Sequence, residues 1–219
     1  MAEETVDHEV KLEQVVLGSL ILKMKLPMPI VDSINQVCDS QKNLPSFNHQ
    51  LAGKIEDEFS LTEVLPDEIK KMFLTFFEQY IKQCNKQFWH CYLDNVWYND
   101  MKAGEYNPPH FHRSSTSDIG LSSVLMLKRP STYGKEYSGA QEPRNGYLTL
   151  IGNSSDPLAA SLYQVDMEPG DFYIFPYTMF HSVNPFNGTD EIRRTLSYNC
   201  NLYRDGIWSL GNKKIITQT

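Results

Sequence analysis

The sequence has few cysteines, and their spacing excludes the classes of protein that depend on them. The 219 residues include four cysteines and no Cys-x-x-Cys pair: Cys38, Cys84, Cys91 and Cys200. A small disulfide-rich domain or a thiolate zinc site needs more cysteines or closer spacing. We therefore expect reduced, buried thiols.

Positive charge is also scarce. The chain has 20 Lys and Arg against 27 Asp and Glu, which gives a net charge of −7. Proteins that bind nucleic acid need a basic face to neutralise phosphates, so we expect no nucleic-acid partner. The expected substrate is a small molecule or a peptide.

Long hydrophobic runs are missing as well. No apolar stretch approaches the length that crosses a bilayer, so we expect no membrane association. The first residues, Met1 to Asp7, are acidic and lack the basic and then apolar pattern of a secretory signal. These features together predict a soluble, intracellular protein of the cytoplasm.

One domain is expected over residues 1–219. This length, with 41% hydrophobic residues, suffices for one substantial core. The sequence shows no internal repeat, low-complexity tract or convincing linker. We expect residues 1–88 to supply a strand and helices that buttress a sheet, and residues 89–204 to form the β-rich core that carries the site.

The first 88 residues show one strand pattern and two helix patterns. Residues 15–25 end in an alternation of apolar and polar residues, which predicts a strand. Helical spacing of apolar residues from Ile30 to Cys38 predicts a short helix. Pro66 is typical of a helix start, and it opens a second helix to about Phe88. The apolar stripe of that helix is expected to pack on a sheet: Ile69, Met72, Phe73, Phe76, Tyr80 and Cys84.

The chain after Trp89 changes to short apolar runs separated by Gly, Pro, Asn and Asp. These runs predict eight strands, at residues 90–98, 110–113, 122–128, 146–151, 162–165, 171–175, 181–184 and 193–203. Eight short strands in one domain are typical of a jelly roll. We therefore expect a mostly β protein with supporting α-helices. Residues 129–145 should form a long loop over the site.

Histidine is the most informative residue type in this chain. His110 and His112 are two positions apart, so in extended backbone both imidazoles point to the same face, about 6.6 Å apart. His181 is expected at the start of a later strand, across the barrel. Six histidines give about 0.16 His-x-His pairs by chance, so the pair alone is weak evidence. Three converging imidazoles would bind a metal ion and leave positions open for a co-substrate and oxygen.

An anion site is expected on the last strand. Alternation over residues 193–199 places Arg193, Thr195, Ser197 and Asn199 on one face, with Arg194 on the other. If the polar face looks into the barrel, Arg193 offers a two-pronged donor to a carboxylate and Thr195 adds a hydroxyl. Arg194 is expected to form a surface salt bridge.

These motifs, in this order, resemble a known family. They are the run from Asn107 to His112, the strand from Ser122, the segment Pro169 to Pro176, His181, and the run from Arg193 to Asn199. Over roughly residues 89–203 the chain is similar to the 2-oxoglutarate and iron(II)-dependent oxygenases of the prolyl-hydroxylase-like branch, nearest to their poorly characterised bacterial and phage members.

The resemblance implies a fold, cofactors and an activity. The fold is a double-stranded β-helix, a cupin-like jelly roll. Fe(II) would be held by His110 and His181, and the distal carboxylate of the co-substrate 2-oxoglutarate by Arg193. The implied enzyme is a dioxygenase that uses O2 to hydroxylate an unactivated C–H bond, with release of succinate and CO2.

One position departs from the family pattern. Most members carry Asp or Glu where this chain has His112. Either His112 is the second ligand of a three-histidine site, or Asp118 supplies the carboxylate instead. Strand geometry favours His112, because it would lie beside His110 without rearrangement.

Three alternatives remain open at the level of sequence. A cupin-like three-histidine iron dioxygenase without 2-oxoglutarate would give Arg193 no role. A non-catalytic jelly-roll binding protein would have a closed metal site or none. A degenerate oxygenase could persist as an interaction module. An apolar strand near the N-terminus could also pair between subunits, so a homodimer is one further option.

Overall fold

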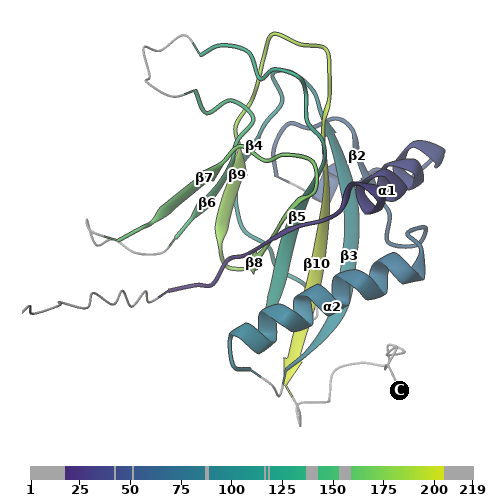
Figure 1. Ribbon diagram of the computed structural model, residues 1–219, viewed down its shortest axis with the longest axis vertical. Coiled ribbons are helices and arrows are strands. Elements are labelled where there is room, and N and C mark those ends of the chain that lie inside the picture. Colours follow the sequence, from purple (N-terminus) through teal and green to yellow (C-terminus); the bar gives the residue numbers. More distant parts are fainter. Residues whose placement is uncertain are drawn as a thin grey trace, which may run out of the picture.

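The structure is a computed structural model (Figure 1). It describes residues 18–41, 43–50, 52–86, 89–115, 117, 119–136, 143–152 and 159–204. Among these residues, no helix is long and apolar enough to cross a membrane.

Two antiparallel sheets form the body of the protein. The larger sheet has the strand order β1-β8-β5-β10-β3-β2 and the smaller one β4-β9-β6-β7. The strands are β1 (Leu22–Lys25), β2 (Glu58–Ser60), β3 (Trp89–Met101), β4 (Asn107–His110), β5 (Gly120–Lys128), β6 (Leu148–Ile151), β7 (Leu162–Val165), β8 (Asp171–Pro176), β9 (Phe180–Val183) and β10 (Arg193–Arg204). Strands that alternate between two facing sheets make the predicted double-stranded β-helix.

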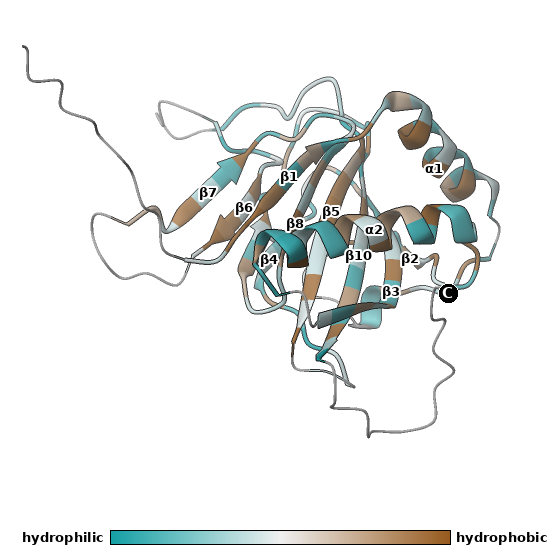
Figure 2. Ribbon diagram, turned by 60° about the horizontal axis from the view of Figure 1, so that its bottom comes forward, coloured by the Kyte–Doolittle hydropathy of each residue, from teal (hydrophilic) through white to brown (hydrophobic). Residues whose placement is uncertain are grey.

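Two helices cover the outer face of the six-stranded sheet. The helix α1 (Met28–Ser40) starts after Pro27 and α2 (Asp67–Gln83) after Pro66, where a fixed proline φ suits a helix start. A short 3-10 turn, η1 (Asn48–Gln50), precedes β2. In Figure 2, α2 carries both hydrophilic and hydrophobic residues, as expected where one helix face packs on a sheet.

Aromatic rings fill the layer between α2 and the sheet. Phe73 stacks on Tyr198 of β10 at 4.9 Å between ring centroids and meets Phe172 of β8 edge-on at 5.2 Å. Phe77, which the predicted stripe omits, is also fully buried there. Because burial of each such ring is worth about 2 kcal/mol or more, this layer is a main source of stability.

The structure corrects several predicted boundaries. The first strand begins only at Leu22, and residues 15–17 lie outside the described part. The second helix ends at Gln83, where Asn85 takes a left-handed φ of 55°. The predicted strand at residues 110–113 is wrong, because β4 ends at His110. The short edge strand β2 was not predicted, since three residues carry no readable periodicity.

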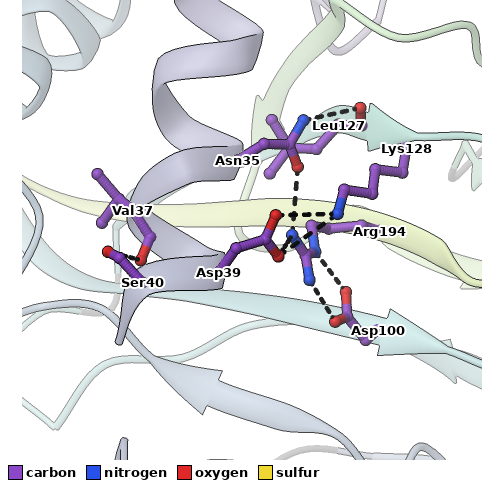
Figure 3. Close-up of polar contacts among 8 residues, drawn as sticks. All are labelled: Asn35, Val37, Asp39, Ser40, Asp100, Leu127, Lys128 and Arg194. Atoms are coloured by element: carbon purple, nitrogen blue, oxygen red, sulfur yellow. Dashed lines mark hydrogen bonds and ion pairs between the residues drawn. The ribbon is translucent and has the colours of Figure 1, made fainter. Parts of the chain in front are cut away.

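The prediction for Arg194 is also wrong. Its side chain is 4% exposed and lies between α1 and the sheet (Figure 3). Nε and Nη2 donate to the two carboxylate oxygens of Asp100, each at 2.6 Å, and Nη1 donates to Asp39 of α1 at 2.6 Å. Burial alone would lower the pKa of Arg194, but the hydrogen bonds to Asp100 and Asp39 outweigh it and raise the pKa. This buried ion pair ties α1 to β10 and β3.

Candidate active site

Three histidines meet between the two sheets. His110 on β4 is the cross-strand partner of His181 on β9. His112 lies just beyond β4, where its backbone N–H donates to the carbonyl oxygen of Tyr177 at 3.0 Å. One imidazole nitrogen from each of the three residues lies within 4.8 Å of the other two. The backbone thus brings together the three residues expected from sequence, although His112 does so from a loop and not from a strand.

Backbone carbonyls fix two of the rings. Nδ1 of His110 lies 2.7 Å from the carbonyl oxygen of Pro108, and Nδ1 of His181 lies 3.0 Å from that of Met179. A carbonyl oxygen only accepts hydrogen bonds, so both Nδ1 atoms carry the proton. Each Nε2 therefore keeps a free lone pair, which is the tautomer that a metal ligand needs.

His112 is held by a side chain and not by the backbone. The amide Nδ2 of Asn199 lies 3.0 Å from Nδ1 of His112, and Nε2 of His112 lies 3.1 Å from Nε2 of His181. In this orientation Nδ1 accepts, while the buried Oδ1 of Asn199 has no hydrogen-bond partner. Turning the amide over lets Oδ1 accept from a protonated Nδ1, which frees Nε2 of His112 for a metal.

Burial keeps all three rings neutral. It lowers the pKa of His110, lowers the pKa of His112 to about 3 with a smaller effect from the charge of His110, and lowers the pKa of His181 well below its usual value. Neutral imidazoles are good ligands for iron and other transition metals. The donor set therefore fits a resident Fe(II).

A polar pocket adjoins the histidines. Its other walls come from β3, β4, β5 and β10: Trp97, Asn99, Asn107, Ser122, Val124, Thr195 and Ser197. The predicted alternation along β10 is confirmed, because Thr195 and Ser197 line this pocket while Leu196 and Tyr198 join the core under the helices. Several polar atoms of the wall have no hydrogen-bond partner among the described residues, including Nε1 of Trp97 and Oγ of Ser122.

Arg193 is buried without an acid. Its side chain is 2% exposed, Nε donates to the carbonyl oxygen of Gly146 at 3.1 Å, and Nη2 contacts Sδ of Met167 at 4.0 Å. No carboxylate of the described residues forms an ion pair with it. Burial lowers the pKa of Arg193, which shows how costly this charge is without an anion.

Tyr133 is a site residue that the sequence did not reveal. It belongs to the loop after β5, packs on Phe186 at 5.6 Å between rings, and lies beneath Arg129. Its buried hydroxyl lies close to Arg193 but forms no hydrogen bond of good geometry with any described residue; burial raises the pKa of Tyr133, and the charge of Arg193 acts in the opposite direction. A lone tyrosine in a long loop offers no periodicity, so only the folded chain shows that it lies near Arg193.

Other residues around the predicted site lie outside the pocket or outside the described part of the chain. Asp118, the alternative second ligand, lies outside the described residues. Phe111 turns away from the pocket and packs on Phe180 at 5.1 Å between rings. The chain after His112 is anchored by Asn201, whose amide donates to Ser114 and to Asp94, each at 3.0 Å.

Residues 95–199 match a protein family described as "Putative 2OG-Fe(II) oxygenase". No curated protein sequence matches the chain.

Solved structures share the fold. A prolyl-4-hydroxylase from Pseudomonas putida is 16% identical with a TM-score of 0.55, over 85% of this chain and 93% of that one. A viral collagen prolyl hydroxylase from Paramecium bursaria Chlorella virus-1, solved with 2-oxoglutarate, is 13% identical with a TM-score of 0.54, over 83% and 96%. HygX from Streptomyces hygroscopicus, solved with nickel and 2-oxoglutarate, is 8% identical with a TM-score of 0.51, over 84% and 83%.

Proposed function

We propose that the chain is a 2-oxoglutarate and Fe(II)-dependent oxygenase of the prolyl-hydroxylase-like branch, in which His110, His112 and His181 hold the iron and Arg193 and Thr195 hold 2-oxoglutarate. When bound, iron, 2-oxoglutarate and O2 supply the oxidising chemistry that hydroxylates a substrate C–H bond and releases succinate and CO2. The chain supplies ligation, orientation and exclusion of water.

One observation carries the assignment of the co-substrate. Arg193 is a fully buried cation on the same strand face as Thr195 and Ser197, yet it has no acidic partner among the described residues. A buried guanidinium is stabilised when an anion binds to it, and its planar arrangement of N–H donors matches the two oxygens of a carboxylate. The distal carboxylate of 2-oxoglutarate is such an anion.

Two further hydroxyls support this role of Arg193. Thr195 lines the pocket two residues along the strand, between Arg193 and the histidines. Tyr133 approaches Arg193 from the loop after β5, close enough to oppose the lowering of the pKa of Arg193 by burial. Both could donate to the carboxylate oxygens that Arg193 leaves free, so the anion would be satisfied on several sides.

The histidine rings are prepared for iron before it binds. The Nδ1–H groups of His110 and His181 hold each ring through a carbonyl, and Asn199 holds His112. Rings that are already oriented lose little entropy on ligation. We assign His112 rather than Asp118 as the second ligand because Nε2 of His112 already lies 3.1 Å from Nε2 of His181.

Aromatic side chains limit water around the three imidazoles. The Trp97 ring stacks on His112 at 5.8 Å between centroids, and the Phe175 ring lies 4.8 Å from that of His181. A dry, low-dielectric site strengthens the attraction between Arg193 and an anionic co-substrate.

The alternatives predict different roles for the same residues. A three-histidine dioxygenase without 2-oxoglutarate would give the buried Arg193 no function. A non-catalytic jelly roll would give the three converging imidazoles no function. The proposed substrate is a small molecule or a peptide. The intracellular location, the single domain and a homodimer remain predictions.

Succinate release tests the proposal without knowledge of the substrate. Protein loaded with Fe(II) and 2-oxoglutarate should form succinate slowly in air, because such enzymes turn over their co-substrate even when uncoupled. The His181→Ala variant, prepared in the same way, should form none above the rate of free iron. Equal succinate formation by the wild type and His181→Ala would refute the assigned iron site.

A further inference from the structure

Three buried oxygen atoms in or beside the pocket have no hydrogen-bond partner among the described residues. They are Oε1 of Glu58, Oδ1 of Asn99 and Oδ1 of Asn107. Glu58 is 2% exposed and Asn99 8%. Buried acceptors are normally satisfied within the fold, so a group of three that are not needs an explanation.

Strand alternation places Glu58 on the pocket side of the sheet. Glu58 is the cross-strand partner of Asn99, which in turn is the partner of Thr195. Directly paired residues share a face, and both Asn99 and Thr195 line the pocket of the three histidines. The next residue, Phe59, points the opposite way and packs on Tyr98 at 5.5 Å between rings.

A neighbouring carboxylate shows what a structural role looks like in this region. Glu105 is buried too, at 8% exposed, but it accepts the backbone N–H of Glu56 at 3.0 Å and that of Lys102 at 2.7 Å. Glu58 has no such bond to Oε1. Burial, with a smaller effect of the charge on Glu105, raises the pKa of Glu58 to about 7. Among the described residues, no donor satisfies Oε1 of Glu58 as the two backbone N–H groups satisfy Glu105.

We propose that Glu58, Asn99 and Asn107 bind a cationic nitrogen of the substrate, a protonated amine or a guanidinium. In this orientation the two amide oxygens suit a ligand with several N–H donors, and the buried carboxylate of Glu58 favours one that also carries positive charge. The inference rests on the proposed function, because it concerns the substrate of the same site.

The position of this subsite limits how the substrate is built. Glu58 and Asn99 are paired on adjacent strands, as are Asn99 and Thr195, and the Cα atoms within each of these two pairs lie about 5 Å apart. The cationic nitrogen and the three imidazoles thus share one small pocket. The C–H bond that reacts lies a few bonds from the nitrogen, as in a basic amino acid side chain or a small amine.

Matched probes test this preference. Protein loaded anaerobically with Fe(II) and 2-oxoglutarate is titrated calorimetrically with butylammonium, butylguanidinium, the neutral butyramide and the anion butyrate. Capped lysine and arginine amides form a second arm, which separates a peptide side chain from a free amine. The wild type should bind at least one cationic probe about tenfold or more tightly than butyramide, and butyrate should be weakest.

Three variants locate the binding. Glu58→Gln keeps the shape but removes the charge and should lose the preference for cations about tenfold, whereas Glu58→Asp should keep part of it. Glu63→Gln removes the same charge from an exposed position and should bind like the wild type. With Mn(II) in place of iron, the paramagnetic ion should broaden the NMR signals of a probe bound in the pocket.

The outcomes separate this inference from the proposed function. No preference for cations in the wild type, an unchanged preference in Glu58→Gln, or no broadening by Mn(II) would overturn the subsite. If these results appear while iron and 2-oxoglutarate still bind, only the subsite is wrong. Failure of the wild type to bind iron or 2-oxoglutarate at all would instead remove the proposed function.

Discussion

Arg193 and Arg194 are consecutive residues on β10, and the contrast between them separates function from structure. Both are almost fully buried, at 2% and 4% exposed. Arg194 points under α1 and is held by Asp100 and Asp39, whereas Arg193 points between the sheets and has a carbonyl oxygen and a sulfur as its neighbours. The pKa of Arg194 is raised and that of Arg193 is lowered.

The difference between Arg194 and Arg193 separates a buried charge that stabilises the fold from one that awaits a ligand. A buried charge that stabilises the fold comes with its counterions, because leaving it unpaired costs several kcal/mol. A buried charge without counterions is kept at a cost in stability, which selection tolerates where a ligand supplies the partner. Glu105 and Glu58 repeat the contrast among carboxylates, since the first is satisfied by backbone N–H groups and the second is not.

The largest expected effect is on iron. His181→Ala removes the proposed ligand at the start of β9, whose Nε2 lies 3.1 Å from Nε2 of His112 and whose Nδ1 is held by Met179. We expect the variant to retain no stoichiometric Fe(II) after desalting, measured by a colorimetric iron assay. The wild type treated in parallel should retain one equivalent. An equivalent of iron in His181→Ala would show that this residue is not a ligand.

Exchanging either arginine for methionine tests the comparison directly. Arg193→Met should bind iron normally but weaken 2-oxoglutarate by about 100-fold or more, because one buried charge-assisted partner is worth about 2–5 kcal/mol. Calorimetric titration of the iron-loaded protein measures this affinity.

Arg194→Met is the matched control on the other face. It leaves Asp100 and Asp39 without their partner, so the free energy of unfolding should fall by about 3–5 kcal/mol in urea titrations. The affinity for 2-oxoglutarate should stay within about twofold of wild type. If the two variants affected affinity and stability alike, the distinction between the two arginines would fail.

Glu58→Gln should stabilise the protein in a pH-dependent way. Because the pKa of Glu58 is raised to about 7 in the fold, the folded protein holds more protons than the unfolded chain between about pH 4.5 and 7, and stability falls as pH rises through that window. Because glutamine cannot ionise, the variant's gain in the free energy of unfolding over the wild type should be near zero at low pH and reach about 3 kcal/mol above pH 7. Thermal melts across that range would measure it; a gain independent of pH would contradict the buried acid.

The second iron ligand is expected to show a smaller effect. Loss of His112 should weaken Fe(II) about 10- to 100-fold, as the other two imidazoles remain, whereas Asp118→Ala should leave the affinity unchanged. Competition with a calibrated chelator measures both variants. The reverse result would make Asp118 the ligand and His112 a supporting residue.

The sequence predicted the fold where periodicity is strong. The strand predicted at residues 193–203 ends within one residue of the end of β10, because alternation over residues 193–199 is regular. Residues 162–165 were predicted with the bounds of β7 from a short run between turn residues. The edge strand β2 and the end of β4 were missed, since each is set by pairing with a distant strand and not by local pattern.

Only those residues of the candidate site that belong to a sequence motif could be predicted. Spacing singled out His110, His112, His181 and Arg193, but the partner of Arg194 lies on a helix 155 residues away in sequence. The residues Glu58, Tyr133 and Asn199 belong to no motif that names their role. What distinguishes them is burial without a satisfied oxygen, and burial is a property of the folded chain.

The most direct test of the central claim is an anaerobic titration of the iron-loaded protein with 2-oxoglutarate, followed by the visible charge-transfer band of the chelate. We expect the band to grow to one equivalent in the wild type and in Arg194→Met, and to need far higher concentrations in Arg193→Met. Iron binding without any band would contradict the account and favour a three-histidine dioxygenase, and no iron binding would favour a non-catalytic jelly roll.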